Sequence, residues 1–278
     1  MNIASLLKQL NQKLQMVTNI PQLEAELLLA QVTQLSRAQL HAYSDRNLTT
    51  EELAALNNLL ERRLNQEPIA YILGYKEFWS KSLHVTKDTL IPRPETENLV
   101  EWILNHFSKS QNLTVADLGT GSGAIAIALA SEHPQWQITA TDYNPNTLAV
   151  AQENAMQFQL NNIQFRLGDW FQALIHNDYD LIVSNPPYIA ENDPYLPNLA
   201  HEPKAALVAK DSGLADLTIL IRDAKNYLKP NGVLVLEHGY EQGAEVRQLL
   251  QKKNYKNIQT HRDLSGLERF TSAQNRNM

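Results

Sequence analysis

The chain has 278 residues, of which 43% are hydrophobic, so it is long enough to form one large domain or two smaller ones. Its formal net charge of -6 argues against a general affinity for nucleic acid backbones, although it leaves room for a local basic patch. There is no cysteine, which excludes disulfides, thiolate metal sites and cysteine nucleophiles.

The beginning of the chain, Met1 to Lys8, is amphipathic and lacks the charged and then apolar pattern of a signal peptide. No segment approaches the run of roughly 18 apolar residues that a membrane span requires. We therefore expect a soluble, cytoplasmic protein that does not bind membranes. The eight histidines are scattered without the spacing of metal ligands, so no metal site is predicted.

Residues 1–70 predict a small helical domain. Leucines recur at helical spacing near its start, at Leu6, Leu7, Leu10 and Leu14. A second helix is expected to begin at Pro21, because proline suits the first turn of a helix. Another is expected after Thr49, which precedes Glu52 by three residues, as in a capping box. Such a domain either only packs against the rest of the chain or holds a substrate.

The helices are expected to end at Pro68, and residues 71–94 are predicted to form a hairpin linker, because Tyr71 to Val85 is rich in aromatic and β-branched residues. Over residues 95–278 strands and helices alternate, which is typical of a doubly wound α/β sheet. Strands are expected at residues 114–118, 137–141, 163–167, 180–184 and 232–237. Helices are expected at residues 124–131, 145–159 and 214–228.

A glycine-rich turn, Gly119-Thr120-Gly121-Ser122-Gly123, follows the first of these strands. Glycines let the backbone turn tightly and approach a ligand without a Cβ in the way. With Ala124 the turn also satisfies the dinucleotide fingerprint, and Asp142, at the end of the next strand, suits the hydroxyls of a ribose. An NAD-type cofactor and an S-adenosylmethionine-type cofactor would both use these residues.

The tetrapeptide Asn185-Pro186-Pro187-Tyr188 follows an apolar run and so lies where a strand ends. Two prolines offer carbonyl acceptors without N–H donors, and each restricts the preceding residue to extended geometry. The Asn185 side-chain oxygen and the Pro186 carbonyl can thus each accept one N–H of a planar NH2 group, beside the Tyr188 ring. The tetrapeptide is interpreted either as a site for a nitrogen that accepts a carbon or as an ordinary turn that ends a strand.

Two features favour S-adenosylmethionine over NAD. An acceptor-only loop has no use in hydride transfer, whereas methyl transfer to nitrogen requires one. Asp117, just before the glycines, is expected to pair with the ammonium of the methionine part. Asp169 and Trp170 follow the third strand, where an acid and a flat side chain would flank the adenine, although Trp170 would also suit the core.

The chain resembles the release-factor glutamine methyltransferases, the HemK or PrmC family. The patches that carry the resemblance are Glu67 to Gly74, Leu90 to Glu97, Asp117 to Gly123, Ser184 to Ile189, His201 to Pro203 with Ala206 and Leu207, and Leu236 to Gly239. It implies methylation of the side-chain amide nitrogen of the glutamine in the Gly-Gly-Gln motif of class 1 peptide chain release factors, with S-adenosylmethionine as donor and S-adenosylhomocysteine as product. It also implies a mostly parallel, seven-stranded Rossmann-like methyltransferase sheet over residues 95–278, with an antiparallel last strand near residues 267–272, and a helical domain at residues 1–70 that binds the release factor.

The resemblance further assigns site residues. It places the cofactor against Gly119, Thr120, Gly121, Ser122, Gly123, Asp142, Trp170 and Asn185, and the substrate glutamine against Asn185, Pro186, Pro187 and Tyr188. Asn185, Pro186 and Tyr188 are expected to carry catalysis by orienting the nitrogen, and no general base is assigned. Arg93 either lies over the site or only begins a helix, and residues 190–212 are expected to form a lid or substrate loop.

Two alternatives remain open from the sequence. The first is a DNA or RNA amine methyltransferase, since nucleobase amines are flat NH2 groups too. Its basic recognition surface would conflict with the acidic balance, so no stable nucleic acid binding is expected. The second is a nicotinamide oxidoreductase, or a non-catalytic binding protein, that uses the same glycines.

Overall fold

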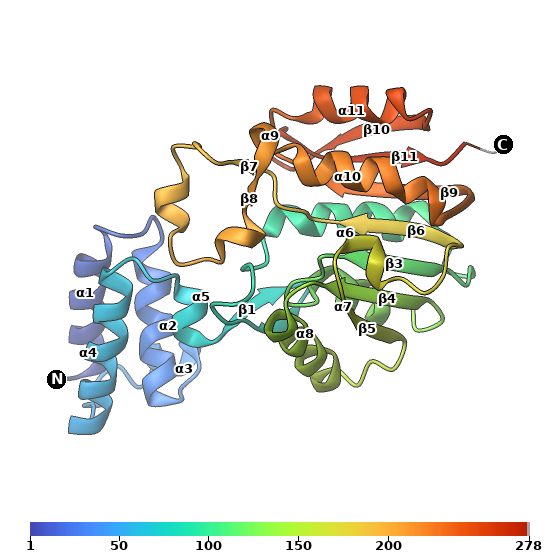
Figure 1. Ribbon diagram of the computed structural model, residues 1–278. Helices are drawn as coiled ribbons and strands as arrows, with labels where there is room; N and C mark the ends of the chain where they lie inside the picture. The colour runs from blue at the N-terminus through green and yellow to red at the C-terminus, as the bar shows by residue number, and fades with distance from the viewer. Residues whose placement is uncertain (277–278) are drawn as a thin grey trace. The chain divides into compact units, whose positions relative to one another are not determined.

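A computed structural model describes residues 1–276 of the chain (Figure 1). They form two units, one of residues Met1–Tyr75 and one that begins at Lys76. The boundary thus falls inside the segment expected to be a linker, 71–94, and the greater part of that segment belongs to the second unit. No helix in residues 1–276 has the length and apolar character needed to cross a bilayer.

The first unit is helical. Its helices are α1 (Ile3–Leu14), α2 (Pro21–Thr33), α3 (Arg37–Ala42), α4 (Thr50–Leu64) and α5 (Ile69–Leu73). The predicted start of α2 at Pro21 is confirmed. The capping box is confirmed too, because Thr49 Oγ1 accepts from the Glu52 N–H while the Glu52 carboxylate accepts from the Thr49 N–H. Pro68 was expected to end the helices, but it stands immediately before α5, because its fixed φ suits the start of a helix.

The helices of the first unit pack around a leucine-rich core that contains the predicted apolar stripe of α1. Inside this unit a buried ion pair ties α2 to α4, with 2.7 Å between Arg63 Nε and a Glu24 carboxylate oxygen. Arg63 also donates to the Val17 carbonyl at 2.9 Å, so the guanidinium has partners for most of its donors. Five packed helices and one buried pair give this small unit a core of its own.

The predicted hairpin is formed by β1 (Tyr75–Phe78) and β2 (Lys81–His84). Phe78 and Leu83 lie in the core of the second unit. The Asn154 side chain of α8 (Pro145–Gln157) accepts from the His84 N–H and donates to the His84 carbonyl, which anchors β2. Gly74, expected within the hairpin, instead ends α5 in the left-handed conformation.

The second unit is built on a seven-stranded sheet with the order β10-β11-β9-β6-β3-β4-β5. Its strands are β3 (Thr114–Leu118), β4 (Gln137–Asp142), β5 (Ile163–Leu167), β6 (Tyr179–Ser184), β9 (Leu228–Glu237), β10 (Lys256–Arg262) and β11 (Glu268–Gln274). Strand β11 runs antiparallel to both of its neighbours, β9 and β10, and the remaining described pairs are parallel, so the mostly parallel, doubly wound sheet and the antiparallel last strand are confirmed. Strand β10 was not predicted, because its half-exposed polar residues lack a clear strand pattern.

Helices cover both faces of the sheet (Figure 1). The helices of the second unit are α6 (Pro94–His106), α7 (Ala124–Glu132), α8, α9 (Lys210–Gly213), α10 (Ala215–Asp223) and α11 (Gly243–Lys252). Alternate strand residues enter different cores: Leu181 and Val183 of β6 pack with α6 and α7, whereas Ile182 packs with α10 and α11. Burial on both faces explains why the parallel strands read as continuous apolar runs.

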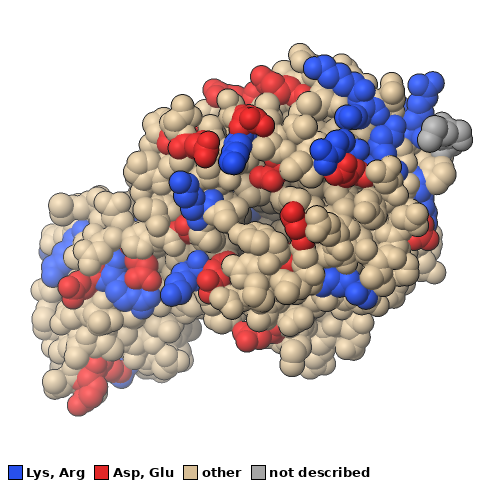
Figure 2. Space-filling view, viewed as in Figure 1, with Lys and Arg blue, Asp and Glu red and all other residues tan. Residues whose placement is uncertain are grey.

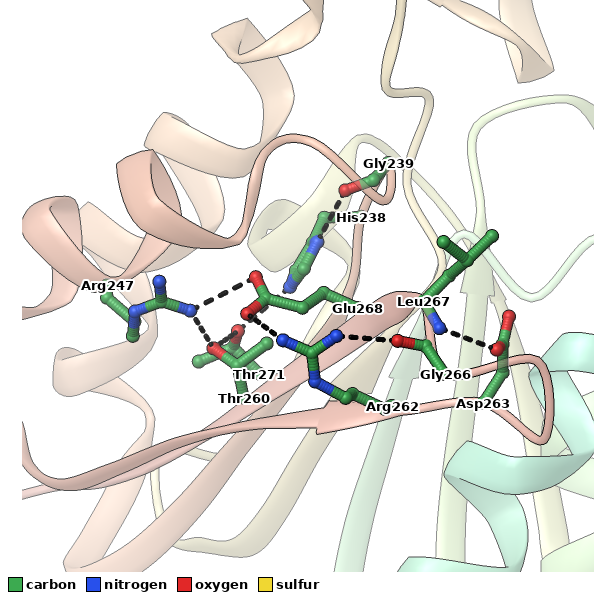
Figure 3. A network of polar contacts seen from close by, with 10 residues as sticks. All are labelled: His238, Gly239, Arg247, Thr260, Arg262, Asp263, Gly266, Leu267, Glu268 and Thr271. Carbon is green, nitrogen blue, oxygen red and sulfur yellow. Dashed lines mark hydrogen bonds and ion pairs between the residues drawn. The ribbon is translucent and has the colours of Figure 1, made fainter.

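A directed chain of hydrogen bonds locks the antiparallel edge (Figure 3). Arg247 donates to Thr260 at 2.8 Å, the Thr260 and Thr271 hydroxyls lie 2.8 Å apart, and Thr271 lies 2.9 Å from His238 Nε2. Because the Gly239 carbonyl beside His238 Nδ1 can only accept, Nδ1 carries a proton and Nε2 accepts from Thr271. Burial lowers the pKa of His238, which favours this neutral ring. This series of hydrogen bonds fixes the carboxyl end of β9, because His238 directly follows that strand.

Candidate active site

The loops after the parallel strands line a cavity of about 560 Å³ in the second unit. Open α/β sheets place ligands at this carboxyl edge, where the strand order reverses beside β3. The residues predicted for the site that line this cavity are Gly119, Thr120, Gly121, Ser122, Asp142, Trp170, Asn185 and Pro187. The structure therefore brings the glycine turn and the tetrapeptide to one space.

The glycine turn is shaped by close packing on two sides. Gly119 has a φ of +71°, and a Cβ built on it would lie 3.0 Å from the Trp170 ring. Gly123 is not among the residues that line the cavity, and its predicted contact with a ligand stays a prediction. A Cβ on Gly123 would lie 2.9 Å from Ile127 and 3.3 Å from Ala151, so this glycine serves the packing of α7 against α8.

Asp142 ends β4 at the cavity wall. One carboxylate oxygen accepts from the Gly121 N–H at 3.1 Å and the other from the Asn144 N–H at 3.0 Å. Burial raises the pKa of Asp142, and these backbone donors oppose that rise. The carboxylate is thus held in a fixed direction, with acceptor capacity left for a ligand hydroxyl.

Asp117 is not among the residues that line the cavity, and its role as partner of a ligand ammonium stays a prediction. Its carboxylate lies beneath the glycine turn, where it accepts from the Thr120 hydroxyl at 2.6 Å and from the Ala126 N–H at 3.2 Å. Burial raises the pKa of Asp117 to about 7. Its contacts assign it to holding the turn against the start of α7.

The charges around the large cavity are mostly negative. Four aspartates line it, Asp88, Asp142, Asp169 and Asp216. The one basic residue among the described lining residues, Arg93, is paired with the buried Glu202 carboxylate at 2.5 Å. Burial raises the pKa of Asp216, which the Trp170 indole N–H partly offsets by hydrogen bonding to it. A ligand with net positive charge suits such a wall better than a pyrophosphate does.

A second cavity of about 200 Å³ adjoins the first. Pro186, Tyr188, Ile189, Leu199 and Leu207 line only the smaller cavity, and the two cavities share Leu90, Arg93, Asn185 and Ala206. Asn185 therefore stands at the junction of a large acidic space and a small, mainly apolar one. The predicted Pro186 and Tyr188 belong to the small space and Pro187 to the large one.

The tetrapeptide is held from several sides. The Tyr188 carbonyl accepts from Gln242 Nε2 at 3.0 Å, and a Cβ on Gly213 would lie 2.1 Å from that carbonyl oxygen. The Tyr188 hydroxyl lies 3.3 Å from the Glu237 carboxylate. Asn185 Nδ2 lies 3.4 Å from the Thr96 hydroxyl. These four partners come from distant parts of the second unit and fix both the backbone and the side chains of the loop.

The segment 190–212 covers part of the cavity, in keeping with the expected lid. Strand β7 (Ile189–Ala190) pairs with β8 (Val208–Ala209) and closes the segment at its base. Glu202 accepts from both Arg93 and the Ile91 N–H, which fastens the middle of the segment to the loop before α6. Arg93 thus lines the cavity and also stands at the start of α6.

Sequence reasoning missed Thr96, Asp216, Glu237 and Gln242. Thr96 and Glu237 stand in two patches that carry the resemblance, Leu90 to Glu97 and Leu236 to Gly239. The sequence thus marked both residues, but it did not indicate what either of them does. Asp216 and Gln242 gave no signal, because their importance depends on side chains far along the chain. No group of three or more potential ligands in residues 1–276 is placed to hold a metal ion.

Comparison with protein-family models finds two matches, a PrmC N-terminal domain over residues 5–74 and a methyltransferase domain over residues 109–275. A curated relative from Coxiella burnetii, named release factor glutamine methyltransferase, is 49% identical over 98% of this chain and 99% of its own length. The relative of the same name from Escherichia coli is 46% identical over 90% of this chain and 91% of its own length.

Among solved structures, a methyltransferase from Pyrococcus furiosus matches with a TM-score of 0.55 and 18% identity, covering 80% of this chain and 100% of that one. A Thermus thermophilus 16S rRNA N2 G1207 methyltransferase in complex with AdoMet and guanosine matches with a TM-score of 0.53 and 20% identity, covering 73% of this chain and 50% of that one. At these identities the likeness concerns the fold alone.

Proposed function

This chain belongs to the release factor glutamine methyltransferase family, and we infer that it methylates the side-chain amide nitrogen of a glutamine in a release factor. One observation carries this function in the structure: Asn185 stands between the large acidic cavity and the small one lined by Pro186 and Tyr188. A methyl donor in the first space and a glutamine amide in the second would meet at Asn185.

We propose S-adenosylmethionine as the donor. Its sulfonium and ammonium outweigh its one carboxylate, so its charge suits a wall with four aspartates. The Asp142 carboxylate would accept from its ribose, the turn from Gly119 to Ser122 would meet the methionine part, and Trp170 would flank its adenine. When bound it supplies a methyl group attached to positively charged sulfur, and S-adenosylhomocysteine is the product.

The residues of this chain would contribute orientation and electrostatics. An amide nitrogen is a weak nucleophile, since its lone pair is delocalised into the carbonyl. The Asn185 Oδ1 atom and the Pro186 carbonyl would each accept one N–H of the glutamine amide, and Tyr188 would bound its plane. The methylated nitrogen then sheds one proton to water, because an N-protonated amide is strongly acidic. No general base is therefore required.

We propose that the partner is a class 1 peptide chain release factor and that the glutamine is that of its Gly-Gly-Gln motif. The helical unit of residues 1–75, which contains the PrmC N-terminal match, would bind the release factor, and the second unit would carry out the transfer. Because release factors work on ribosomes, we place the reaction in the cytoplasm.

The distribution of basic residues bears on the nucleic acid alternative. Figure 2 shows that many Lys and Arg side chains of the second unit gather beside α11 and the C-terminal strands. Lys229 is the second residue of β9, at its amino end. Lys225 donates to the Lys253 carbonyl, beside the turn that leads to β10. The amino ends of parallel strands lie on one side of the sheet and their carboxyl ends on the other. These two lysines lie on the amino side, whereas the cavities lie on the carboxyl side. These two lysines therefore do not form a basic surface around Asn185.

The test is methyl transfer from labelled S-adenosylmethionine to a purified release factor, beside one whose Gly-Gly-Gln glutamine is replaced by alanine and beside bulk nucleic acid. We expect label only in the intact release factor. Asn185→Ala should lower turnover by about 10²–10³, the loss typical when one pre-aligned polar partner is removed, with a smaller effect on cofactor affinity. Label in nucleic acid alone would establish the rival function.

A further inference from the structure

The tetrapeptide rests on a buried carboxylate that no motif assigned. Glu237, the last residue of β9, is 2% exposed and accepts from the Thr96 hydroxyl at 2.7 Å. The Tyr188 hydroxyl lies 3.3 Å from the other oxygen of the same carboxylate. Thr96 is 4% exposed and stands in the first turn of α6. One carboxylate thus connects α6, β9 and the tetrapeptide.

The direction of these hydrogen bonds follows from the number of protons available. A carboxylate only accepts, so the single hydroxyl proton of Thr96 points to Glu237. Toward Asn185, 3.4 Å away, the Thr96 oxygen can then offer only a lone pair. The NH2 end of the Asn185 amide must face Thr96, and its carbonyl end faces the opposite way.

We propose that Thr96 and Glu237 are positioning residues that set the polarity of the Asn185 amide. The two ends of an asparagine amide have nearly the same shape, so packing alone does not choose between them. With NH2 turned to Thr96, Asn185 Oδ1 is the end available to a substrate N–H. The reversed amide would present NH2 to NH2 and repel the nucleophile. This inference rests on the proposed methylation of an amide nitrogen.

In the same arrangement Glu237 orients both ends of the tetrapeptide, Tyr188 by direct contact and Asn185 through Thr96. Burial raises the pKa of Tyr188, so its hydroxyl stays protonated and donates to Glu237. A carboxylate that accepts two hydroxyl protons fixes the Tyr188 ring directly and the Asn185 amide through Thr96. Two of the side chains that line the small cavity, Asn185 and Tyr188, are therefore oriented by one acidic residue.

Protonation of Glu237 would release this polarity, because a carboxyl group with its own proton no longer dictates the direction of the Thr96 hydroxyl. Burial raises the pKa of Glu237 to about 7. The titratable groups that influence it are Tyr188, Arg269 of β11, which lowers the pKa, and Glu95 of α6, which raises it. Turnover should consequently rise with pH through about 7 and then level off.

The experiment compares Thr96→Val, which keeps the shape and removes the hydroxyl, with Thr96→Ser, which restores the hydroxyl. Thr139→Val is the control: Thr139 is also buried and accepts from the Tyr179 hydroxyl, on β4 away from the tetrapeptide. For each variant we measure kcat and KM with the release factor, the Kd of S-adenosylhomocysteine, the Tm, and kcat from pH 5.5 to 9.

We expect Thr96→Val to lower kcat by about 10- to 100-fold, less than outright loss of a polar partner, with the KM and the product Kd changed by no more than about twofold. Thr96→Ser should recover most of the turnover, and Thr139→Val should retain it. Glu237→Gln should lower kcat at pH 8 and abolish its fall below pH 7. The double variant Thr96→Val/Glu237→Gln should be no slower than Thr96→Val, since both changes break one chain.

Wild-type turnover in Thr96→Val, or additive losses in the double variant, would overturn the proposal. A loss of product affinity in proportion to kcat would also overturn it, because it would reveal a merely structural role. If Thr96→Val does not fold, the pH profile of Glu237→Gln decides, and retention of the acid limb there refutes the inference. Failure of the wild-type enzyme to label the release factor would instead refute the proposed function, so the two failures are distinct.

Discussion

Replacing Gly213 by alanine should disable the site from a position outside both cavities. Gly213 has a φ of +85°, and a Cβ built on it would lie 2.1 Å from the Tyr188 carbonyl oxygen and 2.7 Å from Gln242 Nε2. Ordinary contact begins at 3.4 Å, so the backbone on one side must move by about 1.3 Å. A misplacement of this size near reacting groups costs about 10²-fold in rate. We therefore expect kcat to fall by about two orders of magnitude.

The matched control is Gly266→Ala in the turn between β10 and β11. Gly266 has a φ of +80°, and a Cβ there would meet nothing within 4 Å. In both variants an alanine must adopt the left-handed conformation, which lowers the free energy of unfolding by about 1–2 kcal/mol. Because alanine also makes the unfolded chain less flexible, about 0.4–1 kcal/mol of this loss is recovered. Only Gly213→Ala adds overpacking, about 1–3 kcal/mol. Its Tm should thus fall further than that of the control.

The assay is labelled methyl transfer to the release factor at saturating cofactor, with Tm measured by calorimetry. Gly266→Ala should retain nearly all of its turnover while it loses some stability. If Gly213→Ala and Gly266→Ala showed the same kcat, the close packing against Tyr188 would have no bearing on the geometry of the tetrapeptide, and our account of how the loop is held would be wrong.

Three further changes test other parts of the site. Gly119→Ala should weaken binding of S-adenosylhomocysteine by about tenfold in calorimetry, because its Cβ would press on the Trp170 ring at a φ of +71°; unchanged affinity would contradict this. Asp117→Asn should gain stability relative to the wild type as pH rises from 5 to 8. The folded-state pKa of Asp117, about 7, lies above its unfolded value, so its stabilising contribution is complete at low pH and is lost as pH rises through 7; a pH-independent difference in Tm would refute it. Glu202→Gln removes the charge that pairs with Arg93 and should speed amide hydrogen exchange in residues 200–209 and raise the KM for the release factor, with kcat less affected. Unchanged exchange there would show that the ion pair does not fasten the segment.

Much of the fold could be predicted because its signals are local. Pro21 and Thr49 mark helix starts through the backbone chemistry of a few adjacent residues, and both predictions hold. The parallel strands were found because burial on both faces makes them continuous apolar runs. Pro68 misled because a proline that ends one helix also suits the first turn of the next.

The cofactor side of the site was likewise visible in one short stretch of sequence. The glycine turn and Asp142 are adjacent elements of one strand–helix–strand unit, so their spacing already implied a shared ligand. What spacing could not supply was direction. Asp117 faces beneath the turn and Gly123 faces α8, because φ at the three glycines and the packing of α7 decide which groups reach the cavity.

The substrate side is built from contacts between segments far apart in the sequence. Thr96 and Glu237 are 141 residues apart, Ile91 and Glu202 are 111 apart, and Gln242 reaches back 54 residues to Tyr188. No local pattern predicts such partners, since each residue alone suits a helix start, a loop or a strand end. The tetrapeptide could be recognised by its own chemistry, but the groups that orient it could not.

This division follows from what each half of the site must do. The cofactor would be held by three neighbouring loops, through the glycine turn, Asp142 and Trp170, whereas a weakly nucleophilic amide must be placed by acceptors whose polarity and position are both set. Prolines fix the backbone of the tetrapeptide but cannot choose which end of the Asn185 amide faces the substrate. That choice needs a group that only accepts, and a carboxylate buried at the end of β9 supplies one without being exposed to the reaction itself. The antiparallel edge that fixes the end of this strand is thereby connected to the orientation of the nucleophile, although none of its residues lines either cavity.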